Sequence, residues 1–419
     1  MTIGDSSIPV VLLRLDHHGA LGITRSLGRL GIPVYGVHTK EGAPASHSRY
    51  CSRTFVWDLD AVPAAESVNF LEGLARKIGG RPILLPSNDE TALFLAENSE
   101  ALQHSFVFPR NSAVLVRTLF EKQSMFLLAK EVGIPTPETA FPYSRADVVR
   151  FCETARFPVV LKASDGITVA RRTGKKMVIV RSAEELLKNY EEMADAENPD
   201  LILQEYIPGD DSSVWMFNGY FDENSDCLIG FTGRKIHQYP VYTGMTSLGI
   251  CLQNKEVNDL TRRFMKSIGY RGILDIGYRY DARDQQYKVL DINPRVGATF
   301  RLFVAENGMD VVRAMYLNLT GQPVPPSSVH EGRKWIVENM DLISTANYFR
   351  DGKLKVSTWL QSLHGIEECA WFARDDLKPF GEMCGSLMNR IFKKAAREAR
   401  AKLSPKPSSA ERVASGVHP

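Results

Sequence analysis

The stretch that decides the fold is Lys288-Val-Leu-Asp-Ile-Asn-Pro-Arg-Val-Gly297. Its apolar residues indicate a strand, and residues two apart in a strand lie on the same face. Asp291 and Asn293 therefore present a carboxylate and an amide oxygen in one direction, with Arg295 close by. Hard oxygen ligands suit Mg²⁺, and a guanidinium beside them suits a phosphoryl group. The alternative interpretation is a strand that ends in a polar turn at Pro294.

Two lysines upstream occupy positions that an anion would explain. Lys162 ends the apolar segment 158–162, where burying an ammonium without a partner is costly. Lys122 opens a predicted helix, and a cation there opposes the helix dipole unless an anion is present. Nucleotide phosphates would satisfy both side chains. The alternative for Lys162 is a side chain that extends to solvent.

The segment Gln204-Glu-Tyr-Ile-Pro-Gly-Asp-Asp211 leaves a predicted strand as a short linker. Backbone groups of Glu205, Tyr206 and Ile207 are placed to read an adenine edge, with the Glu205 carboxylate accepting from the adenine amine. Asp211 is placed to accept from ribose hydroxyls. The alternative interpretation is a strand followed by a turn in which Asp211 is only a turn residue.

The order of these segments resembles that of the ATP-grasp superfamily, over about residues 10–320. The segments that carry the resemblance are Phe120-Glu-Lys122 through Val132-Gly-Ile-Pro-Thr-Pro137, Pro158-Val-Val-Leu-Lys162, Gln204-Glu-Tyr-Ile-Pro-Gly209 and Asp291-Ile-Asn-Pro-Arg295. The stretch from Gly272 through Arg295, continuing to Phe300-Arg-Leu-Phe303, is most similar to the carboxylate–amine ligase-like branch of that superfamily.

The expected fold is an α/β N-terminal domain of the pre-ATP-grasp, Rossmann-like kind, then an α+β ATP-grasp domain, then a helical C-terminal extension. Strand and helix patterns alternate over residues 1–110, which predicts a doubly wound sheet. No G-x-G-x-x-G follows the first strand, so dinucleotide binding is poorly supported. We expect an ATP-grasp domain of two subdomains over 111–325, the extension over 326–403, and a disordered tail over 404–419.

The resemblance implies ATP-dependent ligation of a carboxylate to an amine through an acyl phosphate, with ATP and Mg²⁺ (or Mn²⁺) as cofactors. Asp291, Asn293 and Asp275 would be the metal ligands, and Arg295 would stabilise the transferring phosphoryl group. Arg234 is a candidate for binding the substrate carboxylate; its alternative is an exposed strand cation. The first metal ligand stays open, because the family register can also point to position 277, which is glycine.

Two other functions remain open. The loop Ala163–Lys176 has few glycines and a basic run, which also suits a nucleotide-binding regulator or scaffold that has lost catalysis. An acid–thiol ligase or a carboxylating enzyme of the same fold is the other alternative. The partners we expect are small-molecule carboxylates and amines, and a homodimer is compatible with the sequence.

The composition indicates a globular cytoplasmic protein. The chain has 419 residues, 44% hydrophobic and 24% charged, with a net charge of +2. It shows no signal peptide and no apolar run long enough to span a bilayer. Its six cysteines lie far apart, which argues against zinc sites and disulfides. Basic residues cluster only in the tail and one loop, so nucleic-acid binding has little support.

Three features have two interpretations each. The amphipathic helix that begins near Phe380 is followed by a basic stretch; it can lie on an anionic membrane, although a packed helix with a solvated basic face is preferred. His17 and His18 follow a strand end, where they either contact a ligand or are loop residues without a role. Asp89 and Glu90 open a helix, where they are either its N-cap and first-turn acid or contacts to substrate.

Overall fold

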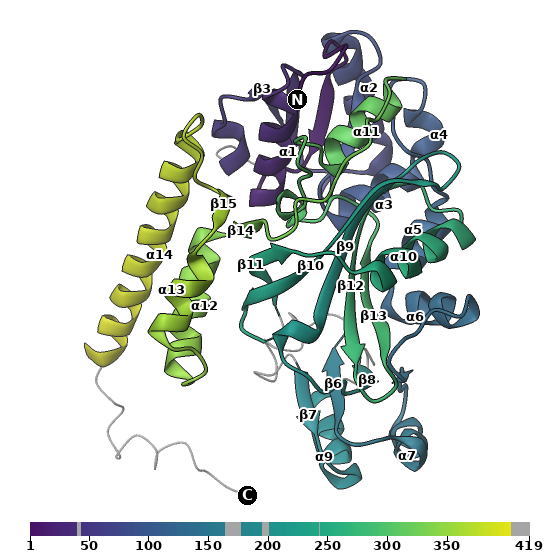
Figure 1. Ribbon diagram of the computed structural model, residues 1–419, viewed down its shortest axis with the longest axis vertical. Coiled ribbons are helices and arrows are strands. Elements are labelled where there is room, and N and C mark those ends of the chain that lie inside the picture. Colours follow the sequence, from purple (N-terminus) through teal and green to yellow (C-terminus); the bar gives the residue numbers. More distant parts are fainter. Residues whose placement is uncertain (40–42, 164–176, 195–200, 243, 404–419) are drawn as a thin grey trace, which may run out of the picture.

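The computed structural model describes residues 1–39, 43–163, 177–194, 201–242 and 244–403. Most of the basic loop Ala163–Lys176 and the whole predicted tail 404–419 lie outside the described residues. The side chain of Asp211 also lies outside them. Figure 1 shows the N-terminal sheet at the top, a large sheet in the middle, a smaller sheet at the bottom, and the C-terminal helices along one side. This is the predicted order of an α/β domain, an α+β domain and a mostly helical extension.

The N-terminal part is built on a parallel sheet with the strand order β3-β2-β1-β4. Its elements are β1 (Val10–Leu13), α1 (His18–Gly28), β2 (Val34–His38), η1 (Pro44–His47), β3 (Cys51–Val56), α2 (Ala64–Ile78), β4 (Ile83–Pro86), α3 (Asp89–Glu97) and α4 (Ser99–Leu102). All four residues of β1 are buried, as expected for a parallel strand covered on both faces. The edge strand β3 is partly exposed and was not anticipated.

The smaller sheet is antiparallel, with the strand order β5-β8-β6-β7. The elements of this region are α5 (Ala113–Phe120), α6 (Lys122–Glu131), β5 (Thr139–Ala140), α7 (Arg145–Thr154), β6 (Val159–Ala163), β7 (Met177–Val180), α9 (Ala183–Met193) and β8 (Leu201–Glu205). Lys122 opens α6, as predicted, because Glu121 has extended backbone and separates α5 from α6.

The large sheet has seven strands in the order β13-β12-β9-β10-β11-β14-β15. This region contains η2 (Asp211–Ser213), β9 (Val214–Phe221), β10 (Cys227–Tyr239), β11 (Met245–Cys251), α10 (Lys255–Ser267), β12 (Gly272–Asp281), β13 (Gln286–Asn293), η3 (Phe300–Leu302) and α11 (Val311–Leu319). Helix α11 returns to pack against α1 of the N-terminal part. Strand β11 was not anticipated from the sequence.

The C-terminal extension contributes strands as well as helices. Its elements are β14 (Lys334–Ile336), α12 (Glu338–Arg350), α13 (Val356–Leu363), β15 (Ile366–Cys369) and α14 (Lys378–Leu403). In α14, Met383 is buried, whereas Met388 and Phe392 are 56% and 66% exposed. Within the described residues, no helix combines the length and apolar character needed to cross a bilayer.

A buried ion pair fastens the extension to the N-terminal part. Arg25 donates from Nε to Asp376 Oδ2 at 2.9 Å and from Nη2 to the Trp371 carbonyl at 2.8 Å. The two charged side chains are 4% and 1% exposed. Removing one partner of such a pair costs about 3–5 kcal/mol, because the other charge is left buried and uncompensated.

We therefore expect Asp376→Ala to lower the free energy of unfolding by about 3–5 kcal/mol. The neighbouring pair Arg29–Asp375 is a matched control, since its side chains are 28% and 41% exposed. Asp375→Ala should cost about 1 kcal/mol or less. Urea unfolding followed by circular dichroism measures both variants. Equal losses would contradict the assignment of Arg25–Asp376 as the anchor of the extension.

Candidate active site

A cavity of about 1310 Å³ lies between the smaller sheet and the large sheet. Residues of β6, β7 and β8 line one side, and residues of β9, β10, β11, β12 and β13 line the other. Residues from α12, α13 and the segment between them close one end. Of the predicted site residues, Lys162, Glu205, Tyr206, Ile207 and Arg234 all line this cavity. Its volume exceeds that of a pocket for a single drug-sized ligand.

Lys162 turns toward the neighbouring strand rather than toward solvent. Its Nζ donates to Gln204 Oε1 at 2.9 Å, and Gln204 Nε2 donates to Thr139 Oγ1 at 3.1 Å. Burial and the nearby Lys122 lower the pKa of Lys162 to about 8. A cation held in these surroundings favours an anionic ligand. Gln204 was not singled out from the sequence, although it directly precedes the predicted adenine segment.

This lowered pKa predicts how nucleotide affinity depends on pH. As the pH rises through about 8, Lys162 loses its proton and its charge-assisted bond to a phosphate. We expect ATP affinity to fall by about ten-fold or more above that pH, since such a bond contributes roughly 1.5–3 kcal/mol. Lys162→Ala should show the weaker affinity at every pH, and Lys162→Arg should show little pH dependence because arginine stays charged. Calorimetric titration of ATP below and above pH 8 measures this; an unchanged dissociation constant in Lys162→Ala would exclude the phosphate contact.

The Glu205 carboxylate is engaged in ion pairs. It accepts from Arg283 Nη2 at 2.6 Å and lies 3.2 Å from Lys288 Nζ, which also pairs with Asp281 at 2.7 Å. The predicted contact of this carboxylate with an adenine amine would compete with those ion pairs. The backbone carbonyl of Ile207 accepts from Arg279 Nε at 2.9 Å. Backbone recognition of adenine by residues 205–207 stays a prediction.

Strands β12 and β13 bring the predicted metal ligands together. Asp275 lies directly opposite Asn293 in the antiparallel register, and Gly277 lies opposite Asp291. Of the two positions considered for the first metal ligand, 275 and 277, only Asp275 has a side-chain oxygen on the face that Asp291 and Asn293 share. A Cβ at Gly297 would come within 2.5 Å of Asp275 Cγ, so the backbone after β13 closes over this carboxyl group.

The two carboxyl groups differ in their pKa values. Burial raises the pKa of Asp275 to about 6, and the charge of Asp291 adds to the rise. Burial also acts to raise the pKa of Asp291, but Lys122 and Asn293 outweigh it and hold that pKa below its ordinary value. Lys122 Nζ pairs with Asp291 Oδ1, and Asn293 Nδ2 donates to Asp291 Oδ2 at 3.0 Å. Asp291 is therefore ionised over a wider pH range than Asp275.

The ligand set fits a hard divalent cation. It consists of the carboxylates of Asp275 and Asp291 and the amide oxygen of Asn293. The described residues contain no cluster of three or more His, Cys, Asp or Glu side chains that could hold a metal ion. Mg²⁺ commonly takes one or two protein carboxylates and completes its shell with phosphate and water. The ammonium of Lys122 pairs with the same carboxylate, so phosphate oxygens beside the cation would compete with Asp291 for it.

Arg295 connects this cluster to the N-terminal part. Its Nε pairs with Asp89 at the start of α3, and its Nη2 donates to Asn293 Oδ1 at 3.2 Å. The arginine side chain is 17% exposed. Asn88, not Asp89, caps α3, since its side chain accepts from Thr91 N. Asp89 is thus free of a capping role and orients Arg295, a function not apparent from the sequence.

The two histidines have different surroundings. His17 caps α1, with Nδ1 accepting from Ala20 N at 3.3 Å and Nε2 lying 3.1 Å from Ser87 Oγ. His18 is 3% exposed, and its ring centroid lies 5.7 Å from that of Trp335. Burial lowers the pKa of His18 to about 3. Both are therefore built into the N-terminal part rather than left as loop residues without a role.

Arg234 lines the cavity from β10. Its guanidinium carbon lies 5.4 Å from the centroid of the Trp215 ring. Its Nε atom is buried and has no hydrogen-bond partner in the part of the chain that the structure describes. Because an orphaned buried donor is costly, this guanidinium is suited to an anionic ligand. This environment favours the predicted carboxylate contact over an exposed strand cation.

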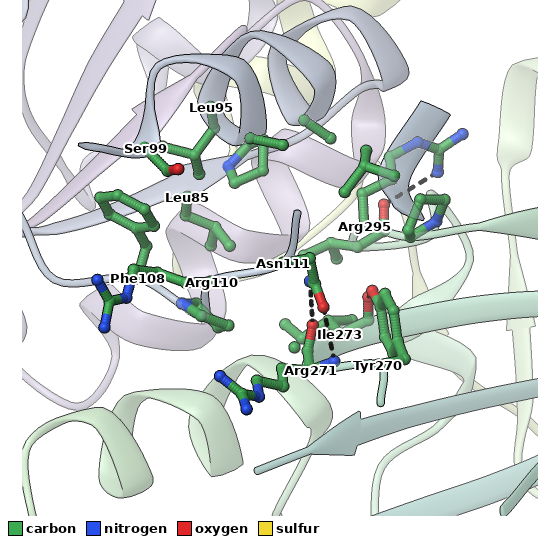
Figure 2. Close-up of a pocket in the computed structure, with 18 of the residues that line it drawn as sticks. Leu85, Leu95, Ser99, Phe108, Arg110, Asn111, Tyr270, Arg271, Ile273 and Arg295 are labelled. Atoms are coloured by element: carbon green, nitrogen blue, oxygen red, sulfur yellow. Dashed lines mark hydrogen bonds between the residues drawn. The ribbon is translucent and has the colours of Figure 1, made fainter. Parts of the chain in front are cut away.

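A second, much smaller cavity lies where the N-terminal part meets the large sheet (Figure 2). It measures about 50 Å³ and is lined mainly by apolar side chains, among them Leu85, Leu95 and Phe108. Asn111 and Arg271 bridge its lower side through two hydrogen bonds of 2.6 and 2.9 Å. Arg295 borders it. The cavity is too small for a nucleotide and marks the junction that positions Arg295.

Comparisons with known proteins agree with this geometry. Residues 121–299 match the family model of an ATP-grasp domain. The chain is 27% identical over 243 residues to D-aspartate ligase of Enterococcus faecium, covering 55% of this chain and 57% of that protein. The chain thus spans a little over half the length of this curated relative.

Two solved structures share the fold. N5-carboxyaminoimidazole synthetase from Staphylococcus aureus complexed with ADP superposes with a TM-score of 0.61 at 14% identity, over 84% of this chain and 87% of that one. L-amino acid ligase from Bacillus licheniformis gives a TM-score of 0.56 at 13% identity, over 75% of each chain. At these identities the similarity establishes the fold alone.

Proposed function

We propose that the chain is an ATP-dependent ligase that joins a carboxylate to an amine, since residues 121–299 match an ATP-grasp domain and the chain is similar to a D-aspartate ligase. In this reaction ATP phosphorylates the carboxylate, and the amine then displaces phosphate from the acyl phosphate. The observation that carries the proposal is one chain of contacts between the start of α6 and the end of β13, made by Lys122, Asp291, Asn293 and Arg295.

Different residues would bind the nucleotide and the substrate. Lys122 and Lys162 would hold the ATP phosphates, and Arg295 would neutralise charge that develops on the transferring phosphoryl group. Arg234, stacked on Trp215, would bind the substrate carboxylate or a second anionic group on it. Catalysis by these groups depends on positioning and charge, with no covalent step on the protein.

Asp275, Asp291 and Asn293 would hold Mg²⁺. When bound, that cation neutralises phosphate charge and orients the nucleotide. The fit rests on the ligand set described above and on the raised pKa of Asp275, which a neighbouring cation would lower again.

The direct test is a screen for ADP release with Mg²⁺-ATP and pairs of carboxylates and amines, with products identified by mass spectrometry. D-aspartate and L-aspartate are the first carboxylates to include, since the curated relative is named a D-aspartate ligase. A product mass equal to acid plus amine minus water supports the proposal. Nucleotide binding without ADP release for any pair would instead indicate a nucleotide-binding protein without catalysis.

A further inference from the structure

A buried histidine–aspartate pair lies at the wall of the large cavity. His237 lines the cavity from β10, three residues after Arg234, and is 4% exposed. Its Nδ1 lies 2.8 Å from Oδ1 of Asp341, which is 2% exposed. Asp341 belongs to the first turn of α12, so the pair joins the C-terminal extension to the site.

The surroundings of Asp341 determine which ring nitrogen carries the proton. Its Oδ1 also accepts from Ser247 Oγ at 3.0 Å, and its Oδ2 accepts from Thr345 Oγ1 at 3.4 Å. An acceptor of several bonds at a helix N-terminus is stabilised as a carboxylate. His237 Nδ1 must then donate, and in the neutral ring Nε2 keeps its lone pair. The hydrogen bond that the described residues give to this ring is at Nδ1, which leaves Nε2 on the side of the cavity that His237 lines.

The backbone of β10 is shaped to bring this ring into the cavity. The pairing of β10 with β11 shifts register on both sides of His237. Such bulges re-aim side chains, and as a result every residue from Arg234 through Gln238 lines the cavity. The Tyr348 ring, 5.8 Å from that of His237, packs against it from α12.

We propose that His237 is the general base for the incoming amine and that Asp341 is its positioning residue; this rests on the ligase function proposed above. Amines arrive as ammonium ions, which cannot attack. Nε2 takes one proton, and the freed lone pair forms the C–N bond to the acyl carbon. The C–O bond to phosphate breaks with its electrons on phosphate, and the second nitrogen proton leaves with it as hydrogen phosphate. His237 then returns its proton to solvent.

Hydroxylamine as the acceptor distinguishes a general-base role of His237 from a role in nucleotide binding or packing. It is largely unprotonated at neutral pH, so it traps an acyl phosphate as a hydroxamate without a base. In His237→Gln we expect amide formation to fall by about 10²-fold or more, with hydroxamate formation changed by less than about three-fold. Asp341→Asn should show the same pattern, because an amide in place of the carboxylate favours the wrong tautomer. His330→Gln, which changes an exposed histidine, is the matched control.

Each outcome decides between roles. Equal losses of amide and hydroxamate in both variants would overturn the base role and assign His237 to nucleotide binding or to packing. Unchanged amide formation would also overturn it. If the parent protein forms no hydroxamate with any acid, the ligase proposal itself fails, and this inference fails with it. Melting temperatures of the variants identify any that do not fold, and Asp341→Asn then provides the independent second test.

Discussion

Arg295→Ala is expected to lower turnover by about 10³-fold or more while changing ATP affinity by less than about ten-fold. The guanidinium is held by Asp89 on one side and by Asn293 on the other, so it is already oriented before substrate arrives. A preorganised cation stabilises charge that develops only in the transition state, which raises turnover without a matching gain in binding. Single-turnover ADP formation and calorimetric ATP titration separate the two effects.

Two further variants test the geometry of this arginine. Arg295→Lys keeps the charge but loses the planar fork that contacts Asp89 and Asn293 together, so it should restore only part of the lost turnover. Asp89→Asn leaves Arg295 in place without its ion pair and should cause a smaller loss than Arg295→Ala. Full turnover in Arg295→Ala would rule out the phosphoryl-transfer role.

Much of the site could be predicted from the sequence because it follows local rules. Alternation along a strand places Asp291 and Asn293 on one face. The register of β12 and β13 agrees, because it sets Asn293 opposite Asp275 and Asp291 opposite Gly277. The resemblance in the order of motifs predicted the ATP-grasp fold, and the family match and the shared fold confirm it. The start of a helix at Lys122 was likewise predicted from the local pattern.

The rest depends on contacts between distant segments. Asp89 meets Arg295 across 206 positions of sequence, and no local pattern links a helix start to a strand end in another part of the chain. Helix α12 supplies Asp341 to His237 from 104 residues away. The bulges of β10 also arise from pairing with β11, a strand whose small and polar residues gave no apolar pattern. Tertiary pairing, not propensity, decides such features.

The Lys122–Asp291 contact predicts that Asp291→Asn weakens the effect of Mg²⁺ on nucleotide binding. In the parent protein, the carboxylate binds the ammonium of Lys122 until a cation and phosphates are present. Mg²⁺ should therefore tighten ATP binding. The asparagine variant has a weaker metal ligand, and a charged ligand bond contributes roughly 1.5–3 kcal/mol, so the Mg²⁺-dependent gain should fall by about 10- to 150-fold.

Without Mg²⁺ the same variant should bind ATP at least as tightly as the parent. Its Lys122 no longer pairs with a carboxylate and is free to contact phosphate, and one negative charge that repels the nucleotide is gone. Calorimetric titrations with Mg²⁺ and with a chelator, in both proteins, measure the two differences. Asp226→Asn is the control, since that exposed carboxylate pairs only with Lys266 among the ion pairs of the described residues. If the parent binds ATP equally well with and without Mg²⁺, Asp291 is not a metal ligand, and its pairing with Lys122 serves only to hold the lysine in place.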